Sequence, residues 1–190
     1  MQKEKKEKKS KEKKDGHSAS KWVITVSILT FILSIVFSFI STHAMNGLGI
    51  LLATFVLLAI IFVGIIFDLV SMSVTVAKEE EFHAKASKKV FGAKTAIKLI
   101  RNSEKVCSFC ADVIGDICGV LSGAVGAILT MKITETMGLS FDIQFIISAI
   151  VASLTVGGKA AGKYVAKANS TKIVSGVSKV VNVFTFKKDK

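Results

Sequence analysis

The chain has 190 residues, of which 51% are hydrophobic and none is proline, and its formal net charge is +12. The basic residues are concentrated outside the long apolar segments, and no aromatic residues are interleaved among the lysines, which argues against nucleic-acid binding. The apolar segments do not alternate with a period of two, which argues against membrane-spanning strands. The sequence therefore predicts an all-α, polytopic membrane protein with four transmembrane helices and a cytoplasmic juxtamembrane helical hairpin.

Residues 1–21 contain nine lysines, four acidic residues and almost no apolar side chain. Such a composition predicts a disordered, basic cytoplasmic tail, whose lysines are attracted to anionic lipid headgroups. Residues 22–41 are long and apolar enough to form a first transmembrane helix, with Trp22 as an interfacial anchor. A short turn follows, so a second transmembrane helix at 47–77 is expected to return antiparallel to the first.

Residues 78–105 carry eight basic and four acidic residues, with apolar residues at helical spacing between them. Gly92 marks a break between two short helices. We expect this segment to form cytoplasmic juxtamembrane helices at the inner membrane surface.

A third transmembrane helix is expected at 106–132, although this segment contains Asp112 and Asp116. Carboxylates four residues apart share one helix face, and ionisable groups at membrane depth usually mark a functional site. Small residues recur along the same segment at Gly115, Gly119 and Gly123. They predict a smooth face that another helix can approach closely, as in a homodimer.

The fourth transmembrane helix is expected at 143–166, followed by a basic amphipathic C-terminal tail at 167–190. Basic residues gather in the segments before the first span, after the second span and after the fourth span. The positive-inside rule then predicts a multi-pass protein of the cell (plasma) membrane with both termini in the cytoplasm.

Polar residues inside the apolar spans are the candidates for function. Asp68 lies near the inner end of the second span, with Ser71 and Ser73 after it. Counting helix rise from the membrane surfaces places Asp112 and Lys159 at similar depths, so they could form an ion pair. Two interpretations stay open: a structural ion pair that fixes helix register, or a cation site with the oxygen ligands that Mg²⁺ prefers.

From Phe67 onward the chain resembles the transmembrane domain of the CorB/CorC and cyclin M family of magnesium and cobalt transporters. The resemblance rests on FDLVSMSVTVA at the end of the second span, on GAKTAIKLIRNSEKV before the third, on GDICG within the third and on GKAAGK near the end of the fourth. It covers roughly residues 48–184. The resemblance implies divalent-cation transport or sensing by a homodimer, with Mg²⁺ held by Asp68, Ser71, Ser73, Asp112 and Asp116.

The chain departs from the family pattern at three positions. Asp116 stands where the family has Asn, Lys159 where it has Glu, and Gly162 where it has Pro. The cystathionine-β-synthase domains that commonly follow have no counterpart in these residues. The alternative is therefore a non-transporting membrane scaffold or regulator whose Asp and Lys groups are structural. An enzyme is not expected, because His17, His43 and His83 are dispersed along the chain.

Overall fold

The computed structural model describes residues 22–41, 43, 45, 47–138 and 143–186; the basic tail expected at 1–21 lies outside this part of the chain. The described residues form helices and no strand, which confirms the all-α fold class. After a first helix, Trp22–Ser41, come α2 (Ile50–Val76), α3 (Glu79–Ser87), α4 (Ala93–Arg101), α5 (Ser103–Cys107), η1 (Ser108–Gly115), α6 (Asp116–Met137) and α7 (Gln144–Phe186).

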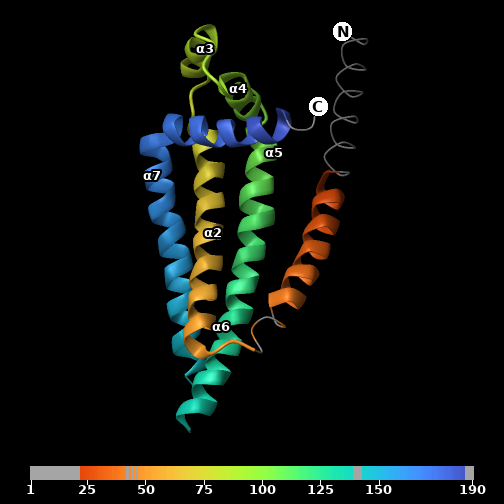
Figure 1. Ribbon diagram of the computed structural model, residues 1–190, viewed down its shortest axis with the longest axis vertical. Coiled ribbons are helices and arrows are strands. Elements are labelled where there is room, and N and C mark those ends of the chain that lie inside the picture. The colour runs from red at the N-terminus through yellow and green to blue at the C-terminus, as the bar shows by residue number, and fades with distance from the viewer. Residues whose placement is uncertain (1–21, 42, 44, 46, 139–142, 187–190) are drawn as a thin grey trace, which may run out of the picture.

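Among the described residues, four helices are long and apolar enough to cross a membrane: Trp22–Ser41, Ile50–Val76, Ser103–Met137 and Gln144–Val183. Figure 1 shows α2 between α7 and α6, with the first helix on the far side of α6. The outward side chains of these helices are large and apolar; Leu51 and Phe55, for example, are 86% and 68% exposed. Such surfaces suit a lipid environment, since large exposed apolar patches are rare on soluble monomers.

α2 packs closely against both neighbours because glycines remove the intervening side chains. A Cβ added at Gly64 would lie 3.0 Å from the Cβ of Cys118 on α6. On α7, Gly158 and Gly162 lie against Ile65 of α2, and a Cβ added at Gly158 would come within 2.2 Å of the Ile65 Cδ1. Small residues at helix contacts allow the close backbone approach that drives association in lipid.

The fourth apolar helix does not end where the C-terminal tail was expected to begin. α7 continues to Phe186 and changes direction at Asn169, whose φ of −126° and ψ of 25° are not helical. Beyond this kink α7 runs across the ends of α2 and α5, beneath α3 and α4 (Figure 1). A buried apolar cluster joins these elements: Val74, Ala77, Phe82, Ala96 and Val174.

The opposite end of the bundle is closed by one lysine. Lys132 of α6 donates hydrogen bonds to the carbonyl oxygens of Met45 and Leu48, at 2.5 and 2.6 Å. Helix ends leave carbonyl groups without partners, and a lysine side chain can satisfy them. The connection between the first helix and α2 is thereby fixed to α6.

We predict that Gly64→Ala destabilises the protein by about 1–3 kcal/mol, because the added Cβ meets the Cβ of Cys118, which cannot move without its backbone. Gly119→Ala is the matched control, since nothing lies within 4 Å of a Cβ added there. The control should be neutral or stabilising by up to about 1 kcal/mol, because alanine favours helix more than glycine does. Circular dichroism during unfolding in detergent micelles measures both; equal effects would contradict the close α2–α6 contact.

The α3–α4 hairpin is held by Glu79, whose Oε1 accepts a hydrogen bond from Arg101 Nε at 2.7 Å and lies 2.9 Å from His83 Nε2. These contacts, Arg101 first and then His83, lower the pKa of Glu79 below its ordinary value of 4.5. A lowered pKa means that the contacts contribute stability above pH 4.5, and that this contribution is lost as the pH falls through the lowered pKa.

We therefore expect faster amide hydrogen exchange in α3 and α4 below pH 4.5, after correction for the intrinsic rate. Glu79→Gln should raise this exchange at neutral pH and remove its dependence on acidification. Glu80→Gln, a change at an exposed neighbour, should leave both unchanged. A hairpin that keeps its protection in Glu79→Gln would show that another contact closes it.

Candidate functional site

Asp68 is the ionisable side chain that lies deepest inside the bundle. Only 7% of the residue is exposed, and its Oδ2 atom is buried without a hydrogen-bond partner. It lies eight residues before the end of α2, which is about 12 Å along the helix axis. A buried carboxylate oxygen without a donor is costly, so its surroundings are the first place to look for a bound cation or proton.

The helix that packs against α2 contains a wider, π-helical segment at the level of Asp68. Ser71 donates a hydrogen bond to Cys107 Sγ at 2.9 Å, and Gly64 lies against Cys118. Asp68 falls between these two contacts, and so does η1, an eight-residue π-helical segment between α5 and α6. π-Helical turns are rare and occur frequently at functional sites. The sequence analysis missed this segment, because its composition does not differ from that of an α-helix.

The base closest to Asp68 is Lys163 of α7, whose Nζ lies 3.9 Å from Asp68 Oδ2. This separation is long for an ion pair, and the Lys163 side chain is 54% exposed. The packing of α7 on α2 positions Lys163 near Asp68, since the neighbouring Gly162 packs against Ile65 and Leu69 of α2. The sequence repeats lysines at 159, 163 and 167, but their spacing alone does not show which of them lies beside Asp68.

The ion pair expected between Asp112 and Lys159 is not formed among the described residues. Asp112 is exposed, whereas the ammonium group of Lys159 lies near Gly115, 3.7 Å from where a Cβ would stand. The expectation assumed an unbroken α-helix. Asp112 lies inside η1, where each residue turns the helix by less than in an α-helix, so its side chain points elsewhere.

The five residues expected to hold Mg²⁺ lie in different surroundings. Ser71 and Ser73 are buried on α2, but Ser71 is bonded to Cys107 and Ser73 to the Leu69 carbonyl oxygen of its own helix. Asp112 and Asp116 are exposed. Within the described part of the chain, no three His, Cys, Asp or Glu side chains gather as metal ligands. Asp68 is the one member of the set that is both buried and short of a hydrogen-bond donor.

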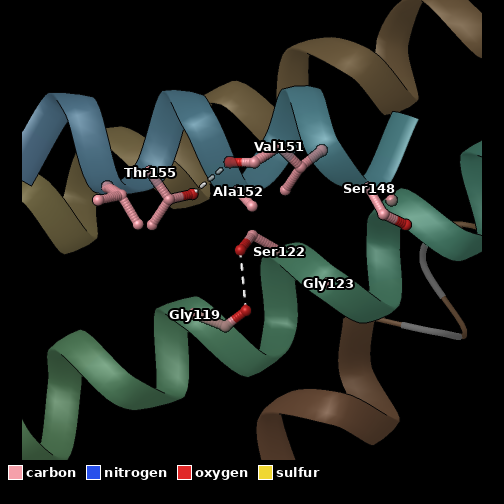
Figure 2. Close-up of a pocket in the computed structure, with 9 residues that line it drawn as sticks. Gly119, Ser122, Gly123, Ser148, Val151, Ala152 and Thr155 are labelled. Carbon is pink, nitrogen blue, oxygen red and sulfur yellow. Dashed lines mark hydrogen bonds between the residues drawn. The ribbon is translucent and has the colours of Figure 1, made fainter. Parts of the chain in front are cut away.

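The glycines of α6 line a groove on the face where α6 meets α7. Figure 2 shows Gly119, Ser122 and Gly123 opposite Ser148, Ala152 and Thr155. The hydroxyl groups of Ser122 and Thr155 donate to carbonyl oxygens of their own helices, Gly119 and Val151. The groove has a volume of about 220 Å³, and no atom lies within 4 Å of a Cβ added at Gly119 or Gly123.

No family model, curated protein or solved structure matches this chain.

The contribution of the Asp68–Lys163 pair is measured by a double-mutant cycle with Asp68→Asn and Lys163→Met. We predict a coupling energy below about 1 kcal/mol, because the pair is long and Lys163 is half exposed. Lys167→Met, which removes an exposed lysine one turn further along α7, is the control. A coupling well above about 2 kcal/mol would identify a tightly held structural ion pair.

Proposed function

We propose that this chain is a multi-pass protein of the cell membrane that binds a divalent cation, Mg²⁺ or Co²⁺, at Asp68 for transport or sensing. The proposal combines the resemblance to the CorB/CorC and cyclin M transporters with one observation. Asp68 Oδ2 is buried without a hydrogen-bond donor, at the level of the π-helical segment η1. A cation bound there would offset the cost of burying this oxygen.

Lys163 would compete with a bound cation for Asp68. Its ammonium group lies 3.9 Å from Asp68 Oδ2 and belongs to a long, half-exposed side chain. A divalent cation that reaches Asp68 would displace this group toward solvent, and the lysine would return when the cation leaves. The negative charge of Asp68 would be balanced by the cation in one state and by Lys163 in the other, so that it is never left unpaired inside the bundle.

Orientation follows from the charges at the two ends of the bundle. The hairpin segment 78–105 has eight basic residues. α7 adds lysines at the same end: Lys163 lies near Asp68, Lys172 follows Thr171, which is bonded to Glu81, and the Lys179 backbone lies against Gly92. The other end has Lys132, whose ammonium group is occupied by two carbonyl oxygens. The basic end is therefore proposed to face the cytoplasm, with both termini on that side.

The second candidate is a scaffold or regulator that moves no ion. The hydrogen bonds of Ser71 and Ser73 favour it, because these hydroxyl groups already have partners inside the bundle. The exposed Asp112 and Asp116 would then face a partner helix, and the α6–α7 groove would serve the homodimer that the resemblance implies.

Isothermal titration of Mg²⁺ and Co²⁺ into the purified, detergent-solubilised chain separates these candidates. If Asp68 binds the cation, we expect saturable binding that Asp68→Asn abolishes. Lys163→Met should tighten binding about fivefold, because it removes the positive charge that competes with the cation for Asp68 Oδ2, and a half-exposed lysine contributes only about 1 kcal/mol. Asp116→Asn and Lys167→Met are the controls and should bind as the unaltered chain does.

The opposite results are equally informative. Binding lost in Asp116→Asn but kept in Asp68→Asn would move the site to α6. No saturable binding to the chain or to Lys163→Met would overturn cation handling and leave the scaffold candidate.

A further inference from the structure

The part of α7 beyond the kink, residues 170–183, is fixed to the hairpin along one face only. Thr171 donates a hydrogen bond to Glu81 Oε2 at 2.7 Å, and Asn182 Oδ1 accepts one from Thr95 at 2.9 Å. Between these bonds, Val174 and Ser178 are 0% and 1% exposed. This face of the segment is therefore fully used by contacts within the chain.

The opposite face is apolar and open. Val180 and Val183 are each 58% exposed, and no atom lies within 4 Å of a Cβ added at Gly176. A helix with 3.6 residues per turn places these three residues on the side away from Val174 and Ser178. The segment crosses the bundle where α2 ends and α5 begins (Figure 1).

Exposed lysines lie on the segment and on the hairpin that covers its other face. Lys172 and Lys179 lie on the segment itself, and Lys88 and Lys89 lie at the turn between α3 and α4. The turn is held beside Lys179, because a Cβ added at Gly92 would lie 3.2 Å from the Lys179 backbone nitrogen. The glutamates of α3 are in its first turn, about 12 Å along the helix from Lys88. Two of them already have partners, Arg101 for Glu79 and Thr171 for Glu81.

Lys89 also has a backbone conformation that favours a different residue. Its φ is +54°, and it closes α3 through hydrogen bonds from Lys89 N to Ala86 O and from Val90 N to Lys85 O. This is the helix-ending motif in which glycine is the usual residue, because glycine adopts positive φ without steric cost. A lysine here gives up local stability and keeps a positive charge next to Lys88 and Lys179. Non-glycine residues with positive φ are concentrated at functional positions.

We propose that residues 170–183 lie in the cytoplasmic membrane surface, with Val180 and Val183 in the acyl boundary and Lys88, Lys89, Lys172 and Lys179 bound to anionic phospholipid headgroups. An in-plane helix with one apolar face and basic borders has the chemistry of an interfacial anchor. Lysines near an anionic leaflet add attraction that falls off within a Debye length, about 8 Å at physiological salt. The proposal does not depend on cation binding at Asp68.

The test uses the full chain in detergent micelles, with the melting temperature followed as phosphatidylglycerol or phosphatidylcholine is added. We expect phosphatidylglycerol to stabilise the protein more than phosphatidylcholine does. Lys89→Gly should raise the melting temperature without lipid, because it relieves the backbone, yet weaken phosphatidylglycerol binding about fivefold. Lys172→Gln with Lys179→Gln should weaken it further. Lys98→Gln, an equal loss of charge at an exposed position of α4, is the control and should bind as the unaltered chain does.

Three results would overturn the proposal: equal stabilisation by both lipids, undiminished phosphatidylglycerol binding by Lys89→Gly, or a Lys98→Gln effect as large as that of Lys89→Gly. The last would mean that net charge alone attracts the lipid. Lys89→Gly decides the question even if the double variant fails to fold, because its expected effects on stability and on lipid binding have opposite signs.

Discussion

The close approach of α2 to its neighbours is the constraint on which the rest of the structure depends. In lipid, apolar side chains gain little by leaving one apolar surface for another, so helices associate through tight packing. Here Gly64 allows α6 to approach α2 closely, and Gly158 and Gly162 do the same for α7. These contacts place Asp68 at the level of η1 and beside Lys163. The buried polar site is thus a direct consequence of how closely the helices pack.

The overall fold could be predicted from the sequence because each long helix is encoded by a long run of apolar residues. Segments such as Trp22–Ser41 and Ile50–Val76 contain no basic residue, and no local alternative competes with a helix. Gly92 was correctly expected to separate two short helices, since it has a φ of +84° at the start of α4. The kink at Asn169 was not expected, because neither proline nor glycine marks it and the break is defined by contacts of the following segment with the hairpin.

The candidate site was less predictable, because it depends on rotation about helix axes as well as on depth. Counting residues placed Asp68 near the inner end of the second span without showing that it is buried, and it paired Lys159 with Asp112. The π-helical segment η1 turns Asp112 away, and the glycine contacts of α7 bring Lys163 to Asp68 instead. Periodicity rules assume regular helices, so they fail at the irregular segment where a functional site is most often found.

The kinked α7 joins two environments through one continuous backbone. Lys163 is six residues before Asn169, about 9 Å along the helix, and the segment after Asn169 is bonded to the hairpin. A change in the tilt of that segment would move the part of α7 before Asn169, which carries Lys163. Because Lys163 Nζ is already at 3.9 Å from Asp68 Oδ2, a displacement of one bond length separates the two charges. Anchoring of that segment in the membrane surface, as proposed, would therefore link the lipid composition of the membrane to the charge balance at Asp68.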